Sequence, residues 1–250
     1  GVIKKMLPTF MSNYYKFSIP ISMLMVFLAF MIISTDYVGP QKDISSCESD
    51  DQIQVICNFI NSEDIVITPD KKFLFMSQMG SIAPWGENES GYFAIMDLSD
   101  NKKIIPKITL EENTWGEETC TRKDYDEYGP HGIDLVERND GRYQIGVISH
   151  YPKESVEMFE LRKNDLSWEI IWRGCVNVPD EYYFNDLSLR KDGTFYASHM
   201  YKRGITMNEW FLMALLKSNS GNIVLWENAN FTEIKGSEGS SPNGIVLDEE

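Results

Sequence analysis

Residues 184–196 read FNDLSLRKDGTFY, and this stretch decides the expected fold of the chain. Apolar side chains alternate at Leu187 and Leu189, which predicts a half-buried β-strand. The turn segment Lys191-Asp192-Gly193 follows. An Asp-Gly pair is typical of a tight hairpin turn because glycine adopts positive φ without strain. A second strand is expected over residues 194–199, and the hairpin as a whole indicates a β-protein.

The start of this hairpin occurs four times along the chain, counting the copy at Asn185–Leu189. Each copy has a polar side chain first, then Asp or Gly, and then apolar residues at its third and fifth positions. The copies are Glu63–Ile67 (EDIVI), His131–Leu135 (HGIDL), Asn185–Leu189 (NDLSL) and Asn243–Leu247 (NGIVL). Repeats of roughly 40–50 residues or a little more, with several short strands each, are typical of β-propeller blades. Equivalent positions of successive blades would then converge near one axis.

The fourth copy stops at Glu250, before its hairpin is complete. A propeller closes on itself to remove its sheet edges. We therefore expect residues 59–250 to form a partial propeller with roughly the first four blades, and about two further blades to follow Glu250.

The composition is that of an ordinary globular protein with a strong acidic excess. The net charge is −15, and the sequence has no basic stripe that would neutralise the phosphates of a nucleic acid. This argues against nucleic acid as a partner. The four cysteines, Cys47, Cys57, Cys120 and Cys175, form no CxxC pair, so the sequence does not indicate a zinc or thioredoxin-type site. Cys57 precedes the first blade, where a disulfide to a cysteine of the last blade, beyond Glu250, would close the propeller; buried free thiols are the alternative.

An apolar segment precedes the repeats. Residues 1–16 are polar with several lysines, residues 17–34 are uncharged and largely apolar, and residues 35–58 form a linker rich in Ser, Asp, Gly and Pro. A segment of this length is just long enough to span a bilayer as a helix. It is predicted to be an uncleaved membrane anchor or a cleaved signal, with a helix of a soluble core as the third alternative. Either of the first two places residues 35–250 outside the cytoplasm.

Other short apolar segments bounded by Gly, Pro, Asn or Asp are expected to be strands. They are residues 65–67, 73–76, 92–98, 133–136, 143–149, 156–161, 169–173, 187–189, 194–199 and 223–227. Asn208–Lys217 is ambiguous, because it fits a short helix, lying over the site or facing a membrane, and also fits a strand.

The converging positions suggest a cation site. Calcium binds oxygen ligands from carboxylates, amides and backbone carbonyls, and Glu63, Asn185 and Asn243 would supply such oxygens from three blades. Neutral amides beside one carboxylate leave the ion able to polarise a substrate carbonyl. Asp64 and Asp186 point to the other side of their strands and would serve a second ion. The alternative is that these side chains satisfy turn backbone groups.

Histidines are the candidates for proton transfer. His131 opens the second copy of the repeat, and His150 ends the second strand of the same hairpin. Two histidines near a Lewis-acidic ion are able to activate a water molecule. His199 follows the second strand of its own hairpin, and a structural role is favoured for it.

Taken together, five segments resemble the paraoxonase/arylesterase family, within the wider group of gluconolactonase and senescence-marker-protein propellers. They are Ser62-Glu63-Asp64, Pro130-His131-Gly132-Ile133, residues 147–152 (VISHYP) with residues 155–159 (SVEMF), Asn185-Asp186 and Pro242-Asn243-Gly244-Ile245. The likeness covers residues 61–250, and members of the family commonly keep a hydrophobic N-terminal segment.

The resemblance implies a six-bladed propeller that holds two calcium ions and hydrolyses lactones or aryl esters. By resemblance, Glu63, Asn185 and Asn243 bind the catalytic calcium, and Asp64, Asp186 and the backbone carbonyl of Ile133 bind the structural one. His131 and His150 correspond to the family's histidine dyad, whose role as general base is debated. The family's later Asp-Asn ligand pair would lie beyond Glu250, so this chain by itself is expected to be inactive.

Two alternatives stay open. One is a sugar lactonase of the gluconolactonase type, with one divalent ion and a more polar pocket; the pairing of His131 with His150 argues against it. The other is a non-catalytic calcium-binding propeller module, in which ion binding is purely structural.

Overall fold

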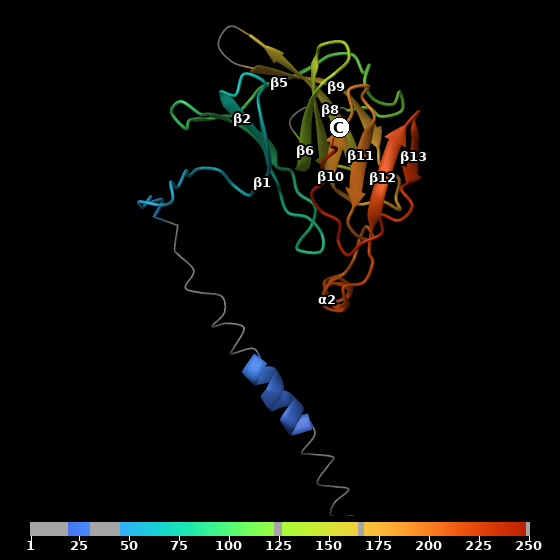
Figure 1. Cartoon of the computed structure of the whole chain (residues 1–250). Helices are drawn as coiled ribbons and strands as arrows, with labels where there is room; N and C mark the ends of the chain where they lie inside the picture. Colours follow the sequence, from blue (N-terminus) through green and yellow to red (C-terminus); the bar gives the residue numbers. More distant parts are fainter. Residues whose placement is uncertain (1–19, 31–45, 123–126, 165–167, 249–250) are drawn as a thin grey trace, which may run out of the picture. The chain divides into compact units, whose positions relative to one another are not determined.

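The computed structural model describes residues 20–30, 46–122, 127–164 and 168–248, and the chain divides into two units, residues 1–55 and 56–250 (Figure 1). In the first unit, residues 20–30 form an exposed helix. The rest of the expected apolar segment, residues 17–19 and 31–34, lies outside the described residues. Within the ranges described, no helix combines the length and the apolar character needed to cross a bilayer.

The second unit is built from three β-sheets, and each sheet contains four consecutive antiparallel strands (Figure 1). Sheet 1 consists of β1 (Ser62–Ile67), β2 (Phe73–Gln78), β3 (Tyr92–Asp97) and β4 (Lys103–Ile104). Sheet 2 consists of β6 (Pro130–Glu137), β7 (Tyr143–Ser149), β8 (Ser155–Lys163) and β9 (Trp168–Asn177), with β5 (Ile108–Leu110) added parallel to β9. Sheet 3 consists of β10 (Phe184–Leu189), β11 (Phe195–His199), β12 (Asn222–Glu227) and β13 (Asn230–Glu233). The expected all-β fold is therefore confirmed.

The first hairpin of each sheet closes with the same kind of turn. One residue of each turn has positive φ, namely Lys71 (57°), Gly141 (79°) or Gly193 (92°). In all three turns the backbone N–H of this residue donates to the carbonyl three residues earlier. Glycine at two of the three positions adopts this conformation without strain. The sequence repeat therefore corresponds to a repeat of backbone geometry.

The first strands of the three sheets lie next to one another, with β6 between β1 and β10. They belong to different sheets, and aspartate side chains connect them. The Oδ2 atom of Asp64 accepts from the N–H of Ile133 on β6 at 2.8 Å. In the same way, Asp134 of β6 accepts from Leu189 of β10 at 2.7 Å. The first link lies near the starts of β1 and β6, and the second lies at the end of β10, so β6 is held to both neighbouring first strands.

Two apolar cores fill the spaces between the sheets. Between sheets 1 and 2, Phe93 contacts Phe75 and Phe159, with ring centroids 5.2 and 5.4 Å apart. Between sheets 2 and 3, strands β7, β8, β10, β11 and β12 contribute the buried side chains Ile148, Val156, Met158, Phe184, Leu187, Phe195, Ala197 and Val224. The alternating apolar residues of the hairpins supply both cores.

The fourth copy of the repeat differs from the prediction. Residues 243–247 belong to no sheet, so the described residues hold three sheets and not roughly four blades. The copy nevertheless follows β10, because Ile245 donates to Asp186 at 2.9 Å and Leu247 donates to the hydroxyl of Ser188 at 3.0 Å. Both hydrogen bonds end on side chains of β10, so residues 243–247 form no backbone ladder with that strand, and no described strand pairs with their other side.

The ambiguous segment is a helix, so the strand alternative is wrong. Helix α2 (Met207–Leu216) begins at a capping box, in which Thr206 and Glu209 bind each other's backbone N–H groups. Trp210 and Met213 pack against the buried residues around Tyr201. The helix therefore packs against other residues of the β11–β12 connection, in which it lies.

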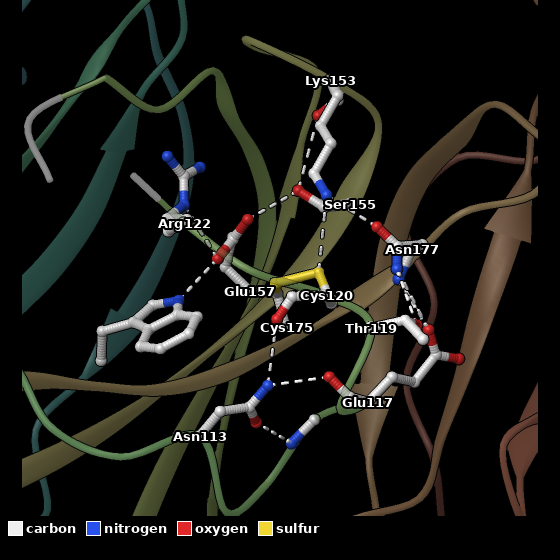
Figure 2. Close-up of a disulfide and its surroundings, with 12 residues drawn as sticks. Asn113, Glu117, Thr119, Cys120, Arg122, Lys153, Ser155, Glu157, Cys175 and Asn177 are labelled. Carbon is white, nitrogen blue, oxygen red and sulfur yellow. Dashed lines mark hydrogen bonds and ion pairs between the residues drawn. A yellow bond between two sulfur atoms is a disulfide. The ribbon is translucent and has the colours of Figure 1, made fainter. Parts of the chain in front are cut away.

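A disulfide joins Cys120, in the long connection between β5 and β6, to Cys175 on β9 (Figure 2). Both sulfur-bearing residues are fully buried, and no free cysteine occurs among the described residues. The buried carboxylate of Glu157 lies nearby, 3.1 Å from the guanidinium of Arg122 and 2.7 Å from the indole N–H of Trp172. The disulfide therefore fixes the β5–β6 connection against the end of sheet 2.

Candidate functional site

The first residues of the four repeats line one cavity. Glu63, His131, Asn185 and Asn243 border a cavity of 290 Å³ at the start of the first strands. Its remaining walls are mostly apolar and aromatic, and they consist of Met79, Ile82, Trp85, Met200, Tyr201, Trp210, Ser241 and Pro242. The structure thus brings together four polar groups that are distant in the sequence.

A continuous row of polar groups, beginning at the half-buried Glu63 and continuing through buried residues, leads away from this cavity. The Nε2 atom of His131 lies 3.2 Å from Oε1 of Glu63, and its Nδ1 atom lies 3.0 Å from Nε2 of His150. The Nδ1 atom of His150 lies 2.9 and 3.0 Å from the carboxylate oxygens of Glu154. The row therefore runs from Glu63 to Glu154 through both histidines.

The proton positions in this row follow from the donor inventory of each group. The carboxylate of Glu154 only accepts, so Nδ1 of a neutral His150 carries the proton and its Nε2 accepts from Nδ1–H of His131. The Nε2 lone pair of a neutral His131 then faces the Glu63 carboxylate at 3.2 Å. Two acceptors at this distance repel each other unless a proton or a cation lies between them.

Burial controls the electrostatics of His150. Loss of solvation lowers the pKa of His150 below 6.5, although the neighbouring Glu154 acts in the opposite direction. The ring also packs against Tyr183, with the ring centroids 4.5 Å apart. A neutral His150 with a fixed ring orientation is suited to accept from Nδ1–H of His131 while it donates to Glu154.

Asp64 and Asp186 lie on the two sides of the Gly132-Ile133 segment of β6. Each uses Oδ1 to accept from the N–H of its own following residue, and each uses Oδ2 to accept from a neighbouring repeat. Burial raises the pKa of Asp186 to about 7, and the negative charges of Asp64 and Glu63 add to this effect. Burial also raises the pKa of Asp64.

Gly132 permits the close approach of β10 to β6. A Cβ atom at this position would lie 2.5 Å from Cα of Asp186 and 2.6 Å from the carbonyl oxygen of Asn185. Both contacts involve backbone atoms, which cannot move aside without separating the strands. Glycine at position 132 therefore positions both members of the Asn-Asp pair.

The potential metal ligands are oxygen atoms of mixed type. No group of three or more His, Cys, Asp or Glu side chains suited to hold an ion occurs in the part of the chain that the structure describes. The cavity instead presents one carboxylate, from Glu63, and the amides of Asn185 and Asn243. Each carboxylate oxygen of Asp64 and Asp186 accepts one hydrogen bond and so retains a lone pair.

Sequence reasoning missed two groups of this region. Glu154, in the connection between β7 and β8, completes the buried row, but an acidic residue in a loop gives no signal of burial. Asp134 accepts a hydrogen bond from the neighbouring first strand, as Asp64 does. It occupies the fourth position of the repeat, where the pattern allows any residue. His199 lies apart from the row and its Nδ1 accepts from the backbone N–H of Tyr183 at 3.0 Å, in agreement with the structural role favoured for it.

Comparison with known proteins gives distant structural likenesses. No family model matches the chain, and no curated protein matches it. A family GH43 β-1,3-galactosidase with galactodeoxynojirimycin is similar with 11% identity and a TM-score of 0.39, over 68% of this chain and 56% of that protein. A putative glucose dehydrogenase from Thermus thermophilus is similar with 11% identity and a TM-score of 0.35, over 68% of this chain and 45% of that protein. Likenesses of this size assign neither family nor activity.

Proposed function

We propose that this chain acts in calcium-dependent hydrolysis of lactones or aryl esters, similar to the paraoxonase/arylesterase family. The observation that carries the proposal is the row Glu63–His131–His150–Glu154, which ends at a cavity where Asn185 and Asn243 also meet. The proposed fold is a six-bladed propeller, in which sheets 1 to 3 would be blades.

The donor set of the cavity fits a calcium ion. Glu63, Asn185 and Asn243 would hold a catalytic ion with oxygen atoms, and the facing acceptors of His131 and Glu63 favour positive charge between or beside them. Asp64, Asp186 and the carbonyl of Ile133 would hold a structural ion. A cation there would neutralise carboxylates whose burial raises their pKa. When bound, the catalytic ion would supply polarisation of the substrate carbonyl.

The residues of the chain itself would activate and orient the attacking water. Nε2 of His131 faces the cavity and would accept a proton from water. His150 fixes the tautomer of His131 by accepting from Nδ1–H, and Glu154 fixes His150 in the same manner. The arrangement follows the logic of a nucleophile-activating triad, in which an outer carboxylate orients the inner base.

The walls of the cavity indicate the class of substrate. Trp85 and Trp210 meet edge to face over the cavity, with ring centroids 4.7 Å apart, and Met79, Ile82 and Met200 complete the apolar surface. Such walls favour an aliphatic lactone or an aryl ester over a sugar lactone, whose hydroxyl groups need polar partners. A panel of sugar and aliphatic lactones separates these two activities.

The proposed location is outside the cytoplasm, either anchored through residues 17–34 or secreted. The buried Cys120–Cys175 disulfide supports this location, because such bonds persist in oxidising compartments. The proposed partners are a small-molecule lactone or ester, and the membrane in the anchored form.

The proposal is tested by the full-length protein and its Glu63→Gln and His131→Gln variants. We expect lactone hydrolysis that both substitutions reduce by about 10²–10⁴-fold, and that the control substitution His199→Gln leaves near its original rate. Unchanged hydrolysis in both site variants would refute the assignment. Calcium binding without any turnover of esters or lactones would instead favour the non-catalytic module.

A further inference from the structure

Two segments of the second unit carry the sequence Asn-X-Ser/Thr, the acceptor pattern for N-linked glycosylation. They are Asn88-Glu89-Ser90, in the connection between β2 and β3, and Asn230-Phe231-Thr232, at the start of β13. Their structural environments differ sharply.

Asn230 lies at the tip of the hairpin between β12 and β13. The two turn residues, Asn228 and Ala229, both have positive φ, of 51° and 58°, which is the geometry of a tight two-residue hairpin turn. Asn230 and Thr232 are exposed, whereas Phe231 between them packs on the core between sheets 2 and 3. The acceptor amide and the hydroxyl of the pattern thus share the outer face of the strand.

The strand that carries Asn230 is the outermost strand of sheet 3, at the margin of the second unit in Figure 1. The Nδ2 atom of Asn230 donates to the carbonyl of Asn228 at 2.8 Å. An amide nitrogen has two hydrogen atoms, so attachment of a sugar leaves one of them for this hydrogen bond. A glycan at this position requires no change in the fold.

The environment of Asn88 is the opposite. Its Nδ2 atom donates to the backbone carbonyl of His150 at 3.2 Å, and its Oδ1 atom accepts from the N–H of Ala83 at 3.2 Å. The half-buried side chain borders a hollow that also contains Glu154. A glycan at Asn88 would occupy the space beside the histidine row and separate the β2–β3 connection from His150.

We propose that Asn230 is an N-glycosylation site and that Asn88 is not. The co-reactant is a lipid-linked oligosaccharide diphosphate. The bond between the anomeric carbon and the diphosphate oxygen breaks, a bond from that carbon to Nδ2 of Asn230 forms, and the amide loses one proton. The proposal rests on the extracytoplasmic location proposed above and is independent of the hydrolytic activity.

The expected consequence is protection of a sheet edge. In the described residues β13 pairs on one side with β12 and has no strand on its other side. An edge of this kind is able to pair with a strand of another chain. A bulky, strongly hydrated oligosaccharide at the first residue of β13 would hinder such pairing.

The test is expression of the full-length protein in a eukaryotic secretory pathway, with a reporter sequon on an appended C-terminal tail. Peptide:N-glycanase converts each modified Asn to Asp, and peptide mass spectrometry then locates the converted positions. We expect conversion at Asn230 and none at Asn88. Thr232→Ala should abolish the glycan on Asn230, Thr232→Ser should retain it, and Ser90→Ala should change nothing.

Three results would overturn the proposal. A glycan on the reporter but not on Asn230 refutes the Asn230 site alone. A glycan on Asn88 refutes the argument from its buried contacts. Absence of glycan from the reporter and from Asn230 refutes the proposal together with the extracytoplasmic location. None of these results depends on lactone hydrolysis, so the proposed activity is judged separately.

Discussion

The Nδ1 atom of His131 lies 3.0 Å from the Nε2 atom of His150, and both rings are almost completely buried. This contact connects two strands of sheet 2, β6 and the end of β7, at the border of the cavity. Because Glu154 binds the other side of His150, the contact gives His131 a defined tautomer with its Nε2 lone pair toward the cavity.

Removal of the charge of Glu154 should reduce catalysis without reducing substrate binding. In Glu154→Gln the amide no longer fixes the tautomer of His150, so His131 loses its orientation as a base. We expect kcat for lactone hydrolysis by the full-length protein to fall by about 10²-fold, with KM within about twofold. The exposed Glu118→Gln is the matched control. An unchanged kcat would show that Glu154 has no part in the reaction.

Acid should destabilise the protein partly through His150. Burial lowers the pKa of His150 in the folded state below its ordinary value of 6.5, so the unfolded state binds more protons as the pH falls. The stabilisation is therefore present above about pH 6.5 and is lost as the pH falls through the folded-state pKa. The carboxyl of Asp186 acts in the opposite direction over this range, because burial raises its pKa to about 7 and the folded state then binds more protons as the pH falls. The contribution of His150 is therefore measured by thermal unfolding between about pH 7 and pH 5, compared between the protein and a variant without this histidine.

Between about pH 7 and pH 5, the Tm of His150→Gln should fall less, or rise more, than the Tm of the unmodified protein. Burial also lowers the pKa of His199, so the double variant with His199→Gln should show the smallest acid-induced loss of Tm. The same change of Tm with pH in the unmodified protein, the single variant and the double variant would contradict the assignment to these histidines.

Gly132 and Gly244 occupy the same position of the repeat and should respond differently to alanine. A Cβ at Gly132 would clash with the backbone of β10, whereas a Cβ at Gly244 has its nearest neighbour, a carboxylate oxygen of Asp186, at 3.8 Å. We expect Gly132→Ala to lower the free energy of unfolding by at least about 1–3 kcal/mol, and Gly244→Ala to change it by less than about 0.5 kcal/mol. Denaturant titration measures both. Equal effects would contradict the close approach of β6 and β10.

Trp210 should determine the preference for apolar substrates. Trp210→Ala removes a wall of the cavity and the ring contact with Trp85, so kcat/KM for an aryl ester or long-chain lactone should fall by about tenfold or more. The value for a short lactone should change less. Leu215→Ala, on the exposed side of the same helix, is the control. A uniform loss for all substrates would argue against a role in specificity.

Much of the site could be predicted because its residues occupy the same position of a repeat. Polar residues at strand starts are ambiguous singly, but Glu63, His131, Asn185 and Asn243 recur in register, and adjacent first strands bring equivalent positions together. Glu154 was not predictable in this way, since its role depends on burial of the β7–β8 connection and on no repeated pattern.

The same distinction holds for the fold. Strands with alternating apolar residues were predicted correctly, whereas the three-residue β5 gives no recognisable period and pairs with a strand about 60 residues later. In α2 every residue from Trp210 to Leu216 is apolar, so periodicity did not separate helix from strand. The capping box of Thr206 and Glu209 fixes the start of the helix in the structure, and the sequence prediction did not use it.

The most direct test of the account is the rate of aliphatic lactone hydrolysis by the full-length protein after removal of divalent ions, before and after calcium is restored. The account predicts no turnover in the stripped protein, recovery with calcium, and a higher calcium requirement in Asn185→Ala. Turnover that resists the chelator, or absence of turnover with calcium present, would contradict it.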